Sequence, residues 1–400
     1  MALTRRRWMA ATGAAAAAAV ARPGFPEATP APPLPAPLSA DAFHGRQDRL
    51  RAGARAAGMT ALIATPSTSL AWASNLAIDR SERLTALLLI VDGPAILVTP
   101  AFEADNHRRD VVVDEIVPWK EDEDPIAIAA KIVPRGVLGV EATTAYDTAI
   151  RLTASASLEA RDAAEVFAAP RRIKSPEEQD FIREAARRTN LAIAATHKSL
   201  ASGRTEGEIS AVLEREFQAL GVRGGGLVQF GPSAAFPHGA PGERRLARGD
   251  VVLIDAGCKV RGYTSDVTRT VSFGAPSDDV RRVYAAVDRA QKAGIDALRA
   301  GASGEEVDRA ARRVIEEAGW GDAFTHRLGH GLGMDGHEPP YLVRGNAAPL
   351  AAGNTVTIEP GIYLPGKFGV RIEDDYAVGE SAPPGSLSAR PADLVVLKAS

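Results

Sequence analysis

Residues 251–270, VVLIDAGCKVRGYTSDVTRT, carry the pattern that decides the fold of the larger part of the chain. An apolar run over residues 251–254 ends in Asp255, and Asp266 follows eleven residues later beside a second strand-like run. Gly257 and Gly262 permit a hairpin between them, so we expect two facing strands with the carboxylates alongside each other. A lone Asp at a strand end is commonly a turn residue. Two facing carboxylates repel unless a cation lies between them, so the pair indicates a metal site.

Three more potential ligands lie further along the chain in β-like or glycine-rich stretches. His330 lies in HRLGHGLG, Glu359 in TIEPG and Glu373 in VRIEDD. Burying four unpaired carboxylates would be very costly, and divalent cations would neutralise them. Four carboxylates and one imidazole suit Mn²⁺, Co²⁺, Fe²⁺ or Zn²⁺. In hydrolases of this kind, bridging carboxylates hold two metals about 3.5–4 Å apart.

Length and composition restrict the class of protein. The chain has 400 residues, 45% hydrophobic and 24% charged, which is typical of a soluble globular protein with two domains. A single cysteine, Cys258, excludes an internal disulfide framework and a cysteine zinc cluster. The net charge of −3 argues against a nucleic-acid partner. No strongly apolar run reaches the roughly 20 residues that a membrane span needs.

The pattern of helices and strands divides the chain near residue 170. From residue 39 to 170, helical and strand-like runs alternate, which predicts an α/β domain. Ser175 followed by Pro176 and Glu178 is a capping box that predicts the start of a long helix. Helices and strand-rich stretches then follow, so we expect an α+β domain over residues 171–400, with a curved antiparallel sheet flanked by helices.

The N-terminus is typical of an export signal. Three arginines at residues 5–7 precede an Ala-rich run over residues 10–20, and an A-x-A sequence at residues 19–21 offers a cleavage site. The arginines resemble a twin-arginine (Tat) leader, so we expect residues 1–21 to be a Tat-type signal peptide. Residues 22–38 are rich in Pro and Ala and predict a stiff linker. We therefore expect an exported protein, periplasmic or secreted, with the Tat export machinery as a partner.

The five potential ligands occur at spacings of 11, 64, 29 and 14 residues, within the stretches GYTSDVTRT, HRLGHGLG, TIEPGIY and VRIEDD, and HEPP lies between the second and third of these stretches. This ordered set resembles the pita-bread metallopeptidase family, in the branch of aminopeptidase P and prolidase. The resemblance extends to the helix after Ser175 and, more loosely, to a creatinase/prolidase-like N-terminal domain. It implies a pita-bread catalytic domain and two divalent metal ions, with Mn²⁺ favoured and Co²⁺, Zn²⁺ or Fe²⁺ as alternatives.

The resemblance also implies roles for the five ligands. Asp255 chelates one metal and His330 binds the other, while Asp266 and Glu373 bridge the pair. Glu359 binds one metal and takes the proton from a bridging water. The hydroxide formed on the two metals would then attack the scissile carbonyl.

Four further residues match positions that face the substrate in the family. His238 and His337 would stabilise the tetrahedral intermediate or shuttle protons. His326 would contact the proline side of the substrate, and Arg371 would order the site beside Glu373. Any one of these histidines, taken alone, would more often be an ordinary structural residue. Tyr263 fits either a position near Asp266 or a place in the core.

Several functions remain open at the level of the sequence. Methionine aminopeptidases generally lack the large N-terminal domain, and creatinase does not use the full ligand set, so both are disfavoured. An aminopeptidase P, which removes the first residue from a peptide with proline in second position, is the first expectation, and an Xaa-Pro dipeptidase is the alternative. A hydrolase of a non-peptide amide or ester, or a binding protein without activity, are further alternatives. The family also implies a homodimer or higher homo-oligomer.

Overall fold

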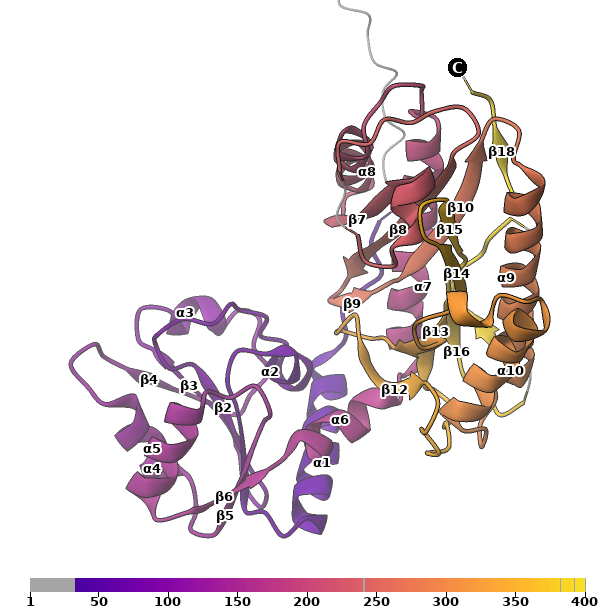
Figure 1. Cartoon of the computed structure of the whole chain (residues 1–400). Coiled ribbons are helices and arrows are strands. Elements are labelled where there is room, and N and C mark those ends of the chain that lie inside the picture. Colours follow the sequence, from indigo (N-terminus) through magenta and orange to yellow (C-terminus); the bar gives the residue numbers. More distant parts are fainter. Residues whose placement is uncertain (1–32, 240–241, 382, 392, 400) are drawn as a thin grey trace, which may run out of the picture.

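The computed structural model describes residues 33–239, 242–381, 383–391 and 393–399. The predicted signal peptide, residues 1–21, lies outside the described residues, as does the linker up to residue 32. The described chain forms two domains, which Figure 1 shows side by side, and this confirms the predicted two-domain fold. No helix in the described ranges is both long and apolar enough to cross a membrane.

The N-terminal domain is built on one six-stranded mixed sheet in the order β4-β3-β2-β1-β5-β6. Strands β1–β3 form an antiparallel meander, while β4, β5 and β6 join through parallel pairings. The strands are β1 (Ala61–Ala64), β2 (Ala86–Ile90), β3 (Ala95–Pro100), β4 (Glu115–Trp119), β5 (Val137–Val140) and β6 (Glu159–Asp162). The helices are α1 (Ala40–Ala56), α2 (Thr68–Ser74), α3 (Ala104–His107), α4 (Pro125–Ile132), α5 (Tyr146–Ala156) and α6 (Ala164–Arg172).

Alternate residues of these strands feed two apolar cores, one on each face of the sheet. Leu62 and its neighbours pack against α1, α2 and α6 on one face. Ile63 and its neighbours pack against α4 and α5 on the other. Because side chains alternate along a strand, a sheet covered on both faces needs strands that are apolar throughout.

The C-terminal domain holds three sheets, in the orders β18-β10-β8-β7 (with β9 on β8), β12-β11-β13-β16-β17 and β14-β15. Its strands are β7 (Gly224–Phe230), β8 (Val251–Val260), β9 (Tyr263–Thr264), β10 (Val267–Phe273), β11 (Gly329–Gly331), β12 (Glu338–Leu342), β13 (Thr355–Ile358), β14 (Gly361–Leu364), β15 (Phe368–Arg371), β16 (Asp374–Ala377), β17 (Gly385–Ser386) and β18 (Val396–Leu397). Its helices are α7 (Pro176–His197), α8 (Glu206–Ala219), α9 (Asp278–Ala297) and α10 (Gly304–Glu317), with 3₁₀ turns η1 (Gly231–Ala235) and η2 (Gly321–Ala323).

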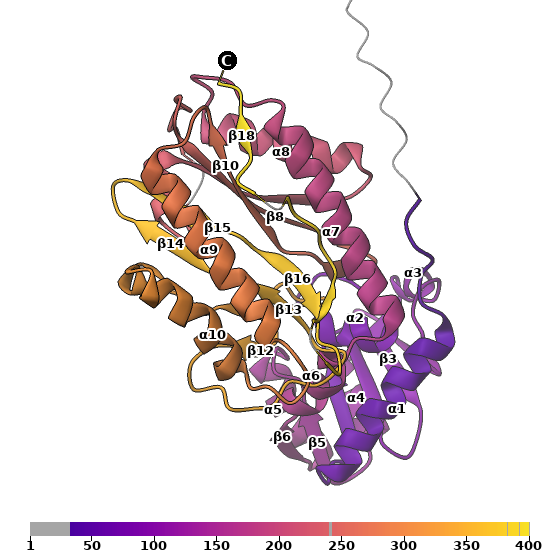
Figure 2. The ribbon, with the colours of Figure 1, turned by 90° about the vertical axis from the view of Figure 1, so that its right-hand side faces the viewer.

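Two pairs of helices enclose these sheets. Helices α7 and α8 pack on β7, β8 and β10, while α9 and α10 pack on β13, β14 and β15. Figure 2 shows the two helix pairs on opposite sides of the strands. The predicted capping box is present, because the Ser175 hydroxyl accepts from the Glu178 backbone N–H and the Glu178 carboxylate accepts from the Ser175 backbone. The two helix pairs therefore shield the strands that lie between them from water.

A buried polar cluster joins the two domains. One oxygen of Glu178, Oε1, lies 2.5 Å from Arg46 Nη2 and accepts from Tyr263 Oη at 2.5 Å. The same oxygen accepts from Trp72 Nε1 at 3.2 Å. Tyr263 therefore lies at the domain junction, three residues before Asp266, rather than beside the carboxylate of Asp266.

Candidate metal centre

The two central sheets and the turns between their strands carry all five predicted ligands. Strand β8 runs antiparallel to β10 with Asp255 opposite Thr268, so the predicted hairpin forms, with β9 inserted in it. The remaining ligands lie on or beside the β11–β13 pair of strands and in the turn from β15 to β16. The ligands lie as follows: Asp255 in β8, Asp266 just before β10, His330 in β11, Glu359 just after β13 and Glu373 between β15 and β16.

These side chains converge on one point. Potential ligand atoms of Asp255, Asp266 and Glu373 lie within 4.8 Å of one another, and so do those of His330, Glu359 and Glu373. His330 Nε2 lies 3.2 Å from Glu359 Oε1 and 3.7 Å from Asp266 Oδ2. The two groups share Glu373, as expected of adjacent cation sites with a common carboxylate.

The electrostatics of this cluster favour a bound cation. Burial and the neighbouring carboxylates raise the pKa of Asp266 well above its usual value. The same two causes, burial first, raise the pKa of Glu373. Carboxylates that resist ionisation for this reason gain most from a divalent cation, and the mixture of oxygen and imidazole donors suits a transition metal. The residues present therefore fit the metal centre that the sequence predicts.

Neighbouring side chains fix the orientation of the ligands. His330 Nδ1 lies 3.1 Å from the Gly331 carbonyl oxygen, and donation to that oxygen leaves Nε2 free as a ligand. The Thr268 hydroxyl donates to Glu373 Oε2 at 2.6 Å. The Thr357 hydroxyl donates to Glu359 Oε1 at 3.2 Å. Such contacts hold a ligand in its binding geometry before the metal arrives.

Arg371 connects the carboxylates to the predicted substrate side. Its Nη2 lies 2.6 Å from Asp255 Oδ2, and its Nη1 donates to Tyr363 Oη at 2.7 Å. Tyr363 Oη lies 2.9 Å from His326 Nε2. A continuous chain of polar contacts thus runs from a ligand to His326. Burial raises the pKa of Tyr363 to about 12, so its hydroxyl stays protonated at neutral pH.

His337 and His238 lie at the mouth of the site. The rings of His337 and His330 meet edge to face, with centroids 4.0 Å apart. His238 lines an open cleft of about 620 Å³ together with Asp255 and Asp266. Both histidines are exposed, as groups that meet a substrate must be. Burial, followed by the charge of His330, lowers the pKa of His337.

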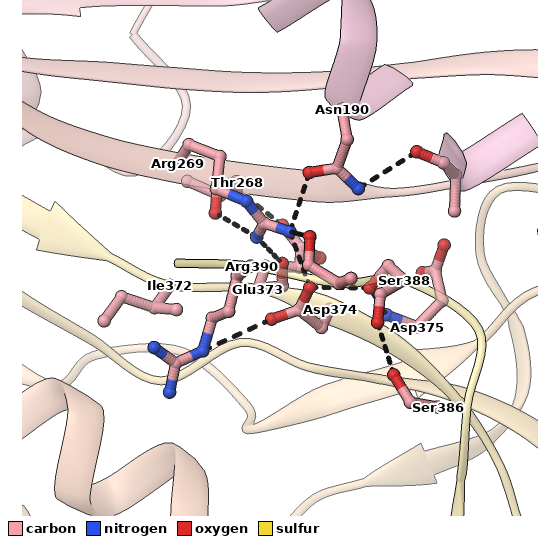
Figure 3. A network of polar contacts seen from close by, with 12 residues as sticks. Asn190, Thr268, Arg269, Ile372, Glu373, Asp374, Asp375, Ser386, Ser388 and Arg390 are labelled. Atoms are coloured by element: carbon pink, nitrogen blue, oxygen red, sulfur yellow. Dashed lines mark hydrogen bonds and ion pairs between the residues drawn. The ribbon is translucent and has the colours of Figure 1, made fainter. Parts of the chain in front are cut away.

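Behind Glu373, a network of charged groups fixes the strands that carry the ligands (Figure 3). Arg269 donates to the Glu373 carbonyl oxygen at 2.7 Å and lies 2.7 Å from Asp374 Oδ1. Ser388 donates to the same oxygen of Asp374 at 2.6 Å, and Asn190 Oδ1 accepts from Arg269 at 2.9 Å. This network compensates the buried carboxylate of Asp374 and fixes the backbone at Glu373, the neighbouring ligand.

Sequence reasoning missed several residues that support the site. Tyr363 and Thr268 lie inside the quoted stretches TIEPGIY and GYTSDVTRT, so their positions were a usable signal. Asp375 accepts from the Asp266 backbone N–H, and Asp374 pairs with Arg269. The local sequence does not show that these contacts form, because Asp374 and Asp375 lie more than a hundred residues along the chain from Arg269 and Asp266.

Comparison with known proteins places this geometry in a family. Residues 180–380 match Metallopeptidase family M24, and residues 46–173 match the Creatinase/Prolidase N-terminal domain. A "Probable dipeptidase PepE" of Mycobacterium bovis is 34% identical over 371 residues, 89% of this chain and 97% of that protein.

Solved structures agree with the sequence match. The dipeptidase PepE of Mycobacterium ulcerans superposes with a TM-score of 0.84 at 34% identity, over 91% of this chain and all of that one. An Xaa-Pro dipeptidase of Bacillus anthracis gives 0.82 at 30% identity, over 89% of this chain and all of that one. An X-Pro aminopeptidase of Thermotoga maritima gives a TM-score of 0.77 at 28% identity, over 86% of this chain and all of that one. The chain therefore belongs to metallopeptidase family M24, and its N-terminal domain is of the creatinase/prolidase type.

Proposed function

We propose that this protein is a dipeptidase that hydrolyses Xaa-Pro bonds with two divalent metal ions. The observation that carries the proposal is the convergence of four carboxylates and His330 on one point beside an open cleft. Asp255, Asp266, His330, Glu359 and Glu373 would hold the cations, with Mn²⁺ favoured over Co²⁺, Zn²⁺ or Fe²⁺. Bound there, the cations would polarise the scissile carbonyl and lower the pKa of a water molecule.

The chain supplies the groups that move protons. Glu359 lies in the cluster with Oε1 3.2 Å from His330 Nε2, and in this proposal its carboxylate takes the proton from the attacking water. Cleavage of an Xaa-Pro bond releases the proline nitrogen as a secondary amine, which must gain a proton. The proton that Glu359 took from the water supplies this need: His337, on the open side of His330, relays it to the nitrogen, and His238 stabilises the oxyanion.

Arg371 and His326 orient the substrate in this mechanism. Arg371 stays charged, because Asp255 and Tyr363 hold it in a buried position. An Xaa-Pro bond is a tertiary amide without an N–H, so a site for proline cannot rely on that donor. His326, fixed by Tyr363 Oη and by the Arg327 carbonyl oxygen, offers a ring surface to the proline side.

The proposal places dipeptides ahead of longer peptides, which reverses the order that the sequence alone favours. What supports the change is the similarity to proteins described as dipeptidases, at 34% and 30% identity, against 28% for the X-Pro aminopeptidase. None of the cleft residues explains such a preference, so a direct comparison of substrates decides it.

The test uses purified protein that is stripped of metal and refilled with Mn²⁺, Co²⁺ or Zn²⁺. An Xaa-Pro dipeptide, an Xaa-Pro-Xaa tripeptide and an Xaa-Ala dipeptide are offered to it and to Asp266→Ala. Metal-dependent cleavage of the Xaa-Pro dipeptide above the tripeptide, lost in the variant, is the expected result. Preference for the tripeptide would make the protein an aminopeptidase. Metal uptake without cleavage would point to another amide or ester, and no metal uptake to a binding protein.

We also propose that the protein is exported by the Tat route and forms a homodimer or a higher homo-oligomer, as the family resemblance implies. Support for export comes from the arginines at residues 5–7 and the A-x-A sequence at residues 19–21. Replacing Arg5 and Arg6 with Lys should leave the folded protein in the cytoplasm, as measured by cell fractionation. Light scattering after gel filtration gives the oligomeric state.

A further inference from the structure

The segment that joins the two domains grips the loop that carries His337. Arg171, in the last turn of α6, lies with Nη2 2.5 Å from Asp335 Oδ2 and 3.2 Å from Glu338 Oε2. Lys174, just before α7, forms an ion pair with Glu338 Oε1. The side chains of Lys174 and Glu338 are 1% and 8% exposed, so this pair is shielded from water and salt.

The gripped loop, residues 332–337, connects β11 to β12 and is also held by other segments, since Lys259 Nζ donates to the Met334 carbonyl oxygen at 2.8 Å and Thr355 bonds to the Leu332 backbone. Thr68 in α2 donates to Asp335 Oδ1 at 2.5 Å, and the Thr264 backbone N–H donates to the Gly333 carbonyl oxygen at 2.7 Å. A Cβ atom on Gly333 would lie 2.8 Å from Lys174 Cε, so the segment that joins the two domains is in close contact with the loop. Residues from both domains and from the segment that joins them therefore determine where this loop lies.

His337 lies in this loop between the two gripped acids. Within the described part of the chain, the His337 side chain makes no hydrogen bond, and its ring contact is the edge-to-face packing on His330. Its position therefore depends on the backbone at Asp335 and Glu338, which Arg171 and Lys174 fix. A displacement of about 1 Å in a group that must reach the substrate can cost up to about a hundredfold in rate.

We infer that Arg171 and Lys174 form a clamp that positions His337 over the cluster of metal ligands, so that the N-terminal domain and the segment that joins it to the C-terminal domain take part in the chemistry. The clamp comprises Arg171, Lys174, Asp335 and Glu338. Arg171 and Lys174 are positioning residues, because they act through His337. A buried ion pair contributes little net stability but can select one arrangement of the chain, which is the role assigned here.

Arg171→Gln tests the clamp with a matched control in the adjacent residue. Glu338 keeps Lys174 as a partner in this variant, so no buried carboxylate is left unpaired. Arg172 pairs instead with Glu165 of its own helix, at 2.5 Å, and its side chain does not reach the loop. We expect Arg171→Gln to lower kcat about tenfold with KM and metal content within twofold of wild type, and Arg172→Gln to change none of these. Arg171→Lys should restore part of the loss.

Two measurements separate positioning from a general structural role. In a His337→Ala background, Arg171→Gln should lower kcat no further, since the clamp acts through the missing ring. Hydrogen exchange over residues 332–338 should rise in Arg171→Gln and not in Arg172→Gln. Full additivity with His337→Ala, or unchanged exchange and kcat, would overturn the inference.

The inference rests on the proposed function, and the exchange measurement keeps the two apart. If wild-type protein cleaves none of the peptides, the proposed function fails, while faster exchange confined to residues 332–338 still supports the clamp. If wild-type protein is active and Arg171→Gln matches it in both measurements, the proposed function stands and the clamp fails.

Discussion

The sheets of the two domains bury different kinds of side chain. All four residues of β1, Ala61–Ala64, are buried and apolar, and their neighbours in β2 and β3 extend the same pattern. In the C-terminal domain, β10 buries Thr268 and Arg269, and the turn into β16 buries Glu373 with the two acids that follow it. The first sheet follows the ordinary rule of an apolar interior, and the second breaks it around one point.

The difference shows where the interior departs from the apolar rule in favour of a functional site. Arg269 and Arg371 pair with Asp374 and Asp255, so those two carboxylates are compensated within the protein. Asp266 and Glu373 have a raised pKa and are not compensated to the same degree. Local rules of burial fail at functional sites, and here the failure marks the place for a cation.

Among the predicted variants, Asp266→Asn should show the largest loss of activity. It should also make the metal-free protein more stable, although it lowers activity. Loss of this carboxylate from the ligand cluster should lower kcat/KM about a thousandfold, which corresponds to roughly 4 kcal/mol. The metal-free protein should melt at a higher temperature than metal-free wild type, because a half-buried carboxylate repelled by its neighbours has been neutralised. Peptide hydrolysis and thermal melting with and without Mn²⁺ measure both effects.

The matched control is Asp92→Asn in the N-terminal domain. Asp92 is 84% exposed and pairs with Arg55 at the surface, so neither activity nor melting should change appreciably. A metal-free Asp266→Asn protein that melts below metal-free wild type would show that the carboxylate cluster is already relaxed without a cation.

Local patterns along the chain predicted more of the fold than of the contacts between distant segments. The Asp255–Asp266 hairpin and the capping box at Ser175 follow from residues close in sequence. Glu178 shows the limit, because its Oε2 completes the cap while its Oε1 receives Arg46 and Tyr263, which lie 132 and 85 residues away. Only the first of these roles leaves a mark on the neighbouring sequence.

One strand boundary was wrong for a similar reason. The stretch VVVDEIV at residues 111–117, rich in β-branched residues, predicts a strand, but β4 covers Glu115–Trp119. The Val111 backbone N–H bonds to His107 and that of Val112 to Ser74, so the first valines close the turn after α3. Pro118 lies inside β4, which is tolerated because β4 is an edge strand.

A pair of Leu→Ala variants sharpens the comparison of the two sheets. Leu62 in β1 and Leu253 in β8 are both fully buried, so each substitution should cost about 2–5 kcal/mol in the free energy of unfolding. Leu62→Ala should leave kcat/KM at 25 °C unchanged. Leu253→Ala should also lower it about tenfold, since β8 carries Asp255 two residues later.

Chemical denaturation and steady-state kinetics measure the two effects on the same preparations. The metal content of both variants is the control, because a loss of metal would lower activity without any shift of β8. Equal activity in the two variants would mean that the strand of the site tolerates a cavity as well as the strand of the N-terminal sheet does.

Two histidines with ring nitrogens in the interior extend the comparison to pH. His107 in the N-terminal domain has Nδ1 3.0 Å from the Thr99 hydroxyl, whereas His197 Nε2 in the C-terminal domain is shielded from water without a hydrogen-bond partner among the described residues. Burial, reinforced by the charge of Arg269, lowers the pKa of His197 from 6.5 to about 4. Uncharged His197 is therefore the form compatible with the fold.

The sign of the pH dependence follows from this shift. As the pH falls from 6.5 to about 4, the unfolded chain takes up a proton at His197 before the folded chain does, so the free energy of unfolding decreases by about 2–3 kcal/mol. His197→Gln should remove this part of the decrease, and its stability relative to wild type should rise over that window. His107→Gln should cost about 1 kcal/mol at pH 7, because it breaks a hydrogen bond. Urea denaturation at half-unit steps from pH 7 to 4 distinguishes these slopes, and parallel curves for wild type and His197→Gln would show that the imidazole gains a proton without loss of the fold.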